Sequence, residues 1–328
     1  MDFSILESGF MGTPAWLWLT FLGIVIILLA ADLGILHRKE REIGVGESLT
    51  LSAGYIGIAS AFGAWVWWQL GAESGMNFFT GFAVEKSLSL DNVFVISLIF
   101  TYFAIPRRYQ HRVLFWGILG VIVLRAIMIA LGTTLVQEFH WLLYIFGAFL
   151  VFTGIKMLVA SGDSHDIDGS AVLNFLRRHL KVTPELHGAR FLVKVEEGGR
   201  SRLRATPLLL ALMLVEIADL IFAVDSVPAI FSITTDPFIV YTSNIFAILG
   251  LRALYFALAA MVDRFKYLKY ALSLVLIFIG GKIFYAQFFG KVPAGISLGV
   301  TFGLLVLGVL LSLLLTAREE RRAAHGME

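Results

Sequence analysis

Long apolar blocks divide the chain, and each block is long enough to cross a lipid bilayer as a helix. A helix needs about 20 mainly apolar residues to span ~30 Å of hydrocarbon. Only 15% of the residues are charged, against about 25% in a soluble domain. The sequence therefore predicts an all-α polytopic membrane protein with about nine transmembrane helices. The blocks cover residues 14–36, 48–70, 77–103, 112–133, 140–160, 206–232, 238–261, 267–289 and 293–316.

Basic residues gather in alternate loops between these blocks. Twenty Lys and Arg residues lie in one set of loops, whereas the other set holds only Lys291. Because cytoplasmic loops carry an excess of Lys and Arg, we expect the N-terminus outside and the C-terminus in the cytoplasm. No cleavable signal peptide is evident.

The chain contains no cysteine, which excludes disulfides, thiolate metal sites and thiol redox chemistry within it. The short glycine fragments "GVGESL" and "GTTL" lack a phosphate-binding context. We therefore expect no enzymatic activity and no nucleic-acid partner. The expected surroundings are the lipid bilayer, and glycine-rich faces such as "GAFLVFTG" suit helix packing within one chain or in a homo-oligomer.

Two halves of the chain resemble each other. "VEKSLSLDNVFVI" (84–96) aligns with "ADLIFAVDSVPAI" (218–230), and "VLRAIMIAL" (123–131) aligns with "GLRALYFAL" (250–258). Each unit has three spans, so the second unit enters the membrane from the opposite face, as in the inverted repeats of many transporters. The predicted parts are two N-terminal helices (1–76), repeat 1 (77–160), a cytoplasmic loop (161–205), repeat 2 (206–289), and a C-terminal helix with a tail (290–328).

Six carboxylates fall within the spans, where each charge costs at least ~2.5–3.5 kcal/mol on insertion scales. One interpretation is an internal ion-pair network that only locks helices together. The other, which we favour because the acids cluster in the repeated helices, is a cation site with proton-accepting carboxylates. The predicted metal ligands are Glu85, Asp91, Glu216, Asp219 and Asp225, with Asp32, Asn92 and Ser226 as accessory residues.

The predicted ligands are all hard oxygens, which suit Mn²⁺, Ca²⁺ or Mg²⁺. None of the seven histidines lies well inside a span. Pro228 lies among these acids, and proline removes a backbone donor. We therefore expect a helix break near Val224–Pro228 that re-aims Asp225 and frees carbonyl oxygens.

Four basic residues inside the spans form two repeat-related pairs. They balance the carboxylates in the metal-free state or form an anion site, and the nearby acids favour the first interpretation. They are Arg125 with Arg252, and Lys156 with Lys282.

The 161–205 loop has three features. "RFLVKVEEGGRSRLRAT" is expected to be a small hairpin or a flexible return, and "AVLNFLRRHLKV" a short amphipathic helix. The acidic turn holds residues that resemble a metal cluster, although helix capping is the blander account. These residues are Asp163, His165, Asp166 and Asp168.

At "EKSLSLDNVFVI", "VEIADLIFAVDSVPAI" and the repeated "LRA", the chain resembles the TerC/Alx family of bacterial membrane proteins, within the lysine-exporter superfamily. The resemblance implies a multi-pass protein of the inner membrane, linked by name to tellurium resistance, with the five acids above as metal ligands. It also implies Mn²⁺ efflux by alternating access, for which proton antiport is a suitable coupling. The alternative is a membrane metal or pH sensor or scaffold that does not transport. Lys86 departs from the expected motif, and whether it weakens divalent binding is left open by the sequence.

Overall fold

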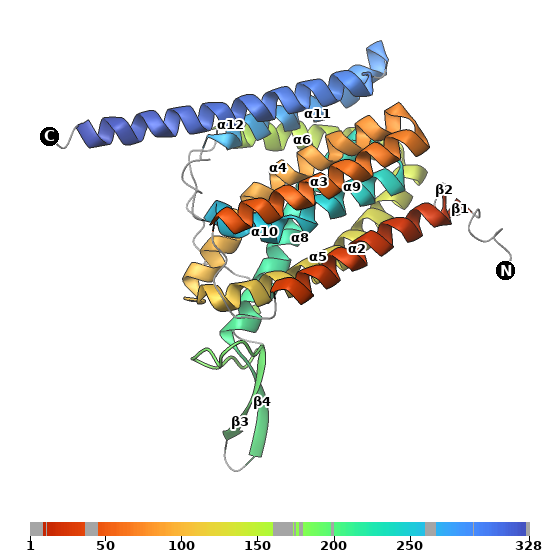
Figure 1. Ribbon diagram of the computed structural model, residues 1–328. Helices are drawn as coiled ribbons and strands as arrows, with labels where there is room; N and C mark the ends of the chain where they lie inside the picture. The colour runs from red at the N-terminus through yellow and green to blue at the C-terminus, as the bar shows by residue number, and fades with distance from the viewer. Residues whose placement is uncertain are drawn as a thin grey trace.

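The computed structural model describes residues 9–10, 12–36, 45–159, 173, 175–176, 180–197, 200–259, 267–290 and 292–325. Helices form nearly all of this part of the chain (Figure 1). They are α2 (Ala15–Leu36), α3 (Val45–Leu70), α4 (Ala72–Tyr102), α5 (Arg107–Glu138), α6 (Leu142–Val159), α8 (Pro207–Ile233), α9 (Pro237–Leu249), α10 (Leu251–Ala259), α11 (Leu268–Phe289) and α12 (Ala294–His325). Two small hairpins complete the described part: β1 (Gly9–Phe10) with β2 (Thr13–Pro14), and β3 (Leu192–Glu197) with β4 (Arg200–Ala205).

The predicted all-α membrane fold is confirmed. Each of the nine apolar blocks is helical, with α9 and α10 together occupying the block at 238–261. Six of the described helices have the length and hydropathy needed to cross a membrane: α3, α5, α6, α8, α11 and α12. α2 and α9 contain shorter apolar stretches. α4 has 31 residues but carries the charged segment around Glu85.

Helices at equivalent positions of the two predicted repeats pack against each other. α4 contacts α8, α5 contacts α9, and α6 contacts α11. Glycines bring the last pair close: a Cβ added to Gly154 would lie 2.7 Å from the carbonyl oxygen of Ser273. The glycines of "GAFLVFTG" thus pack helices within the chain. Two three-helix units related by a two-fold axis would pack in such pairs. The inverted repeat itself stays a prediction.

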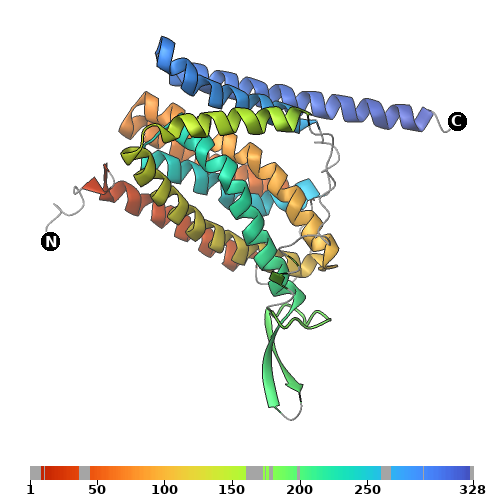
Figure 2. The ribbon, with the colours of Figure 1, turned by 180° about the vertical axis from the view of Figure 1, so that it is seen from behind.

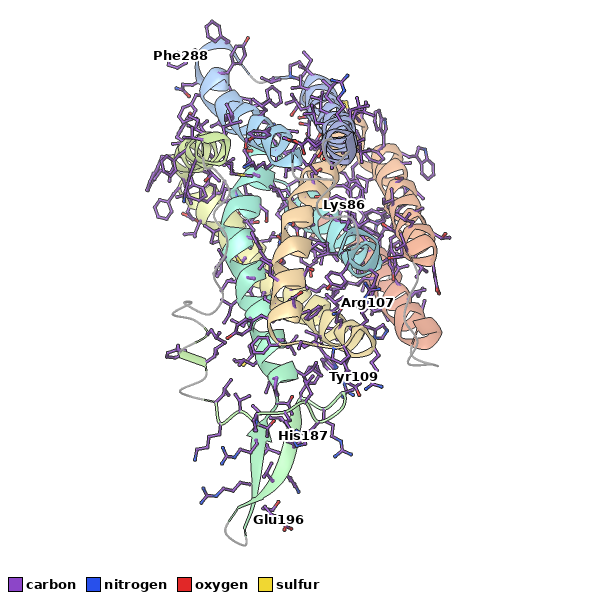
Figure 3. All side chains as sticks on the ribbon, turned by 90° about the vertical axis from the view of Figure 1, so that its left-hand side faces the viewer. Lys86, Arg107, Tyr109, His187, Glu196 and Phe288 are labelled. Atoms are coloured by element: carbon purple, nitrogen blue, oxygen red, sulfur yellow. The ribbon has the colours of Figure 1, made fainter. Side chains whose placement is uncertain are left out.

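The two ends of the bundle differ in the way that the loop charges predict. The start of α4 and the connections α5–α6, α8–α9 and α11–α12 all line one cavity, so the four loops that precede α4, α6, α9 and α12 share one end. The β3–β4 hairpin, which confirms the hairpin expectation, projects from the other end (Figures 1 and 2). The β1–β2 hairpin and the C-terminal end of α12 lie on opposite sides of the bundle in both views. The exposed side chain of Phe288 marks the end opposite the hairpin (Figure 3).

The expected break near Val224–Pro228 is wrong. α8 runs from Pro207 to Ile233 with Pro228 inside it, and it is packed against α4, α5 and α6. Proline removes only one helical hydrogen bond, and these contacts support the helix around it. The interruption lies instead at Gly250, between α9 and α10.

The N-terminal helix α2 is attached to this core by aromatic rings. Phe21 of α2 lies 5.7 Å from Phe246 of α9, and Phe62 of α3 lies 4.7 Å from the same ring. These edge and tilted contacts add to the burial energy of the rings. Together they hold α9 against the outer helices, with its opposite face turned toward α4 and α5.

Candidate cation site

A buried arginine stands at the centre of the candidate site. Arg125 on α5 is 1% exposed, and its guanidinium donates five hydrogen bonds to four side chains contributed by three other helices. The acceptors are Glu85 on α4, Asp219 and Ser226 on α8, and Asn244 on α9. We call these five residues the Arg125 cluster.

The two carboxylates of the cluster come from repeat-equivalent positions. Arg125 Nη1 lies 2.7 Å from Glu85 Oε1, and Nη2 lies 3.2 Å from Asp219 Oδ1. Both acids are buried, at 1% and 8% exposure. A guanidinium suits this place because its planar fork donates in several fixed directions. If both carboxylates are ionised, the cluster carries a net negative charge, which favours a cation.

Asn244 completes the cluster, and sequence reasoning missed it. Its Nδ2 donates to Glu85 Oε2 at 3.1 Å, while its Oδ1 accepts from Arg125 at 3.1 Å. The available signal was the polar run "TSN" inside the apolar block 238–261. Ser226, predicted as accessory, accepts from Arg125 at 2.9 Å.

Next to the cluster, two buried oxygens have no hydrogen-bond partner among the described residues. They are Asn92 Oδ1 and Glu216 Oε2. Asn92 reaches the cluster through Nδ2, which donates to Asp219 Oδ1 at 3.3 Å. Asn92 and Asp219 line a small cavity between α4, α5, α8 and the α9–α10 junction. Its volume of about 30 Å³ is enough for a water molecule or a small ion.

A glycine on α5 makes room for the Glu216 carboxylate. A Cβ added to Gly120 would lie 2.2 to 2.6 Å from the three carboxyl atoms of Glu216. Gly117, one turn earlier, lines the same small cavity. The two glycines of "WGILGV" thus leave one face of α5 without side chains, and the carboxylate of Glu216 from α8 packs against this face.

Several predicted residues cannot be placed at the side-chain level. The side chains of Asp32, Asp91, Asp225 and Arg252 lie outside the described residues, although their backbones belong to α2, α4, α8 and α10. The acidic turn with Asp163, His165, Asp166 and Asp168 also lies outside them, as does half of the expected amphipathic helix.

Two of the predicted charge-balancing residues do not join the acids. Lys156 is exposed in the last turn of α6. The ammonium of Lys282 on α11 lies 3.3 Å from Ser297 Oγ, beside the cavity at the four-loop end of the bundle. That cavity measures about 910 Å³ and also borders Glu73, His140 and Asp236. Lys156 and Lys282 follow the repeat pattern, but only Arg125 is described among the carboxylates.

The oxygens around Arg125 are of the kind that binds a hard metal cation. In this structure, however, the guanidinium of Arg125 occupies the place between them. Every acceptor around Arg125 is a carboxylate, amide or hydroxyl oxygen, and such oxygens are the ligands of Mn²⁺, Mg²⁺ and Ca²⁺. Within the described ranges, no three acidic or histidine side chains converge closely enough to hold a metal ion. A metal ion therefore needs Arg125 to move away before the carboxylates can close around it.

Comparison with known proteins places these residues in a family. No solved structure matches the chain. An uncharacterized membrane protein of Myxococcus xanthus is 49% identical over 303 residues, covering 92% of this chain and 93% of the relative. A relative in Escherichia coli K12, provisionally named membrane-bound redox modulator Alx, is 44% identical over 320 residues, covering 95% of this chain and 98% of its own length. A membrane protein of Rickettsia felis is 49% identical over 297 residues, covering 90% and 97%.

A family model also matches most of the chain. The model described as the integral membrane protein TerC family covers residues 70–321, which include α4 to α11, most of α12 and the whole Arg125 cluster. The chain therefore belongs to the TerC family of integral membrane proteins.

Proposed function

We propose that the protein transports a divalent metal ion, with Mn²⁺ as its cargo, and exports it from the cytoplasm by alternating access coupled to protons. The observation that carries the proposal is the Arg125 cluster, in which one resident cation holds carboxylates from two repeat-related helices. Ca²⁺ and Mg²⁺ are the other ions that such oxygens accept. We place the protein in the inner membrane of a bacterium, with the N-terminus outside.

The unpartnered oxygens favour transport over a purely structural ion-pair network. A buried acceptor without a partner costs about 1–3 kcal/mol, and a cation that binds such an oxygen would offset this cost. Glu216 Oε2 and Asn92 Oδ1 are two such acceptors beside the cluster. Asn92 lines the small cavity next to Asp219, so a cation that enters this cavity would meet its free oxygen.

The exchange that we propose follows from charge. Arg125 neutralises Glu85 and Asp219 when no metal is bound. A divalent ion from the cytoplasm competes for the same carboxylates, so the guanidinium swings aside. When the metal leaves toward the four-loop cavity, a proton binds one of the vacated carboxylates, and its release to the cytoplasm before the next metal ion binds couples the two fluxes. The cavity of about 910 Å³ lies at the end opposite the basic loops, where an exported ion would leave.

The Alx relatives are named as redox modulators. This chain contains no cysteine, so it has no thiol with which to carry out redox chemistry. We also propose no enzymatic activity and no nucleic-acid partner. The bilayer is the expected environment, and association into a homo-oligomer is compatible with the exposed apolar faces.

The test is Mn²⁺ flux in proteoliposomes, with and without a pH gradient. Wild type is compared with Asp219→Asn, which keeps the shape of the side chain and removes its charge. Lys156→Gln is the matched control because this lysine is exposed on α6. We expect gradient-driven flux in wild type and in the control, and none in Asp219→Asn. Mn²⁺ binding without flux in wild type supports the sensor alternative, and absence of both leaves the cluster as a structural ion-pair network.

A further inference from the structure

Lys86 directly follows Glu85 on α4, but its side chain has a different environment. Successive helical residues point about 100° apart, so Lys86 lies beside α9 rather than in the Arg125 cluster. Its Nζ donates to the backbone carbonyl oxygen of Ala247 at 3.1 Å. Figure 3 shows Lys86 inside the bundle. No carboxylate of the described residues lies within ion-pair distance of this ammonium.

The acceptor belongs to the carbonyl end of a helix. α9 ends at Leu249 and α10 begins at Leu251, so Ala247 lies in the last turn of α9. The last four carbonyl groups of a helix lack helical partners, and the helix dipole adds partial negative charge there. The ammonium of Lys86 thus meets a negative backbone surface inside the membrane.

Gly250, at the junction, is explained by the approach of this ammonium. Its φ of −79° and ψ of −4° are ordinary right-handed values, which any residue adopts, so the backbone itself does not require glycine. A Cβ added there would lie 2.8 Å from Lys86 Nζ and 3.2 Å from the Cβ of Tyr55. The missing side chain therefore leaves the space that the cation fills.

We propose that the α9–α10 junction is a binding site for a small monovalent cation, formed by the carbonyl end of α9 and permanently filled by the ammonium of Lys86. Half-helix carbonyl ends coordinate Na⁺ in membrane transporters, and here a side chain takes that position. The site is separate from the carboxylates proposed to bind metal. It also fixes α9, because Ala247 lies one turn after Asn244, which donates to Glu85.

The first experiment removes the tethered cation and supplies a free one. Lys86→Met removes the ammonium and its charge and keeps an unbranched side chain that is one atom shorter. In choline chloride, we expect the purified variant to unfold about 5 °C below wild type, because a charge-assisted hydrogen bond is lost. Methylammonium or K⁺ at equal ionic strength restores most of the Tm, whereas choline is too large to enter. Wild type responds equally to all three salts, and Lys86→Arg retains most of the stability.

A second variant tests the site without removing the lysine. Gly250→Ala places a methyl group 2.8 Å from the ammonium, so it lowers the Tm of wild type, and it lowers the Tm less in the Lys86→Met background, where the contact with Tyr55 remains. Gly281→Ala on α11 is the control, since nothing lies within 4 Å of its added Cβ. Additive effects of the two substitutions, or a Lys86→Met Tm that is the same in methylammonium and choline, overturn the proposal. Neither readout depends on metal transport, so the result stands apart from the proposed function.

Discussion

Replacing Arg125 by methionine tests whether the cluster is a cation site or a structural lock. The substitution removes five donated hydrogen bonds and leaves Glu85 and Asp219 buried without their cation. Breaking a buried ion pair in this way costs about 3–5 kcal/mol. For a protein of this size, we expect the Tm to fall by roughly 10 °C.

The informative quantity is the response of the variant to Mn²⁺. In wild type, the metal must displace the guanidinium, so part of its binding energy is lost to that exchange. In Arg125→Met, the position is vacant, and Mn²⁺ at about 100 times its Kd adds roughly 2.7 kcal/mol of stability. Thermal unfolding of both proteins is measured across a Mn²⁺ titration at constant ionic strength. We expect the larger rise in Tm in the variant, and an intermediate rise in Arg125→Lys.

An equal Mn²⁺ response in wild type and Arg125→Met would refute this reasoning. It would mean that Mn²⁺ binds elsewhere and that the cluster serves only to hold α4, α5 and α8 together. Absence of any Mn²⁺ response in Arg125→Met, in protein that remains folded, would lead to the same conclusion.

Three further predictions follow from single contacts. Gly120→Ala displaces the carboxylate of Glu216 while favouring the helix by about 1 kcal/mol, so we expect Mn²⁺ flux to fall several-fold with little loss of Tm; equal losses of both would contradict it. Gly154→Val forces α6 away from α11, and we expect overpacking to cost about 1–3 kcal/mol in denaturation assays, with Gly281→Val nearly neutral. Asp236 caps α9 by accepting from two backbone N–H groups, so Asp236→Ala costs about 1 kcal/mol and Asp236→Asn much less; equal costs would assign the effect to charge rather than capping.

The positions of the helices were predictable because membrane-spanning helices must be long and apolar. The expected blocks agree with the observed helices to within a few residues at most ends. The acids Glu85 and Asp219 were predicted from their cost in lipid, and they do converge on one partner. That partner could not be deduced, since sequence spacing does not say which of four basic side chains faces inward.

The features that the sequence did not predict correctly all depend on packing between helices. Pro228 looks like a break, yet neighbouring helices support α8 through it. Gly250 looks like an ordinary apolar-block glycine, yet a lysine from another helix approaches it. Asn244 was overlooked because one amide in an apolar block carries no charge that demands a partner. Each of these facts depends on a second helix that local sequence does not identify.

The guanidinium of Arg125 is joined covalently to α5, and this affects how such a site would respond to metal concentration. A ligand joined to its binding site through a few bonds acts at a high effective concentration that dilution cannot lower. Trace ions therefore meet a site that is already satisfied, and only a cytoplasmic metal level that outcompetes the guanidinium can load it. A transporter built in this way stays idle at ordinary metal levels and begins to work above a threshold set by the geometry of one side chain.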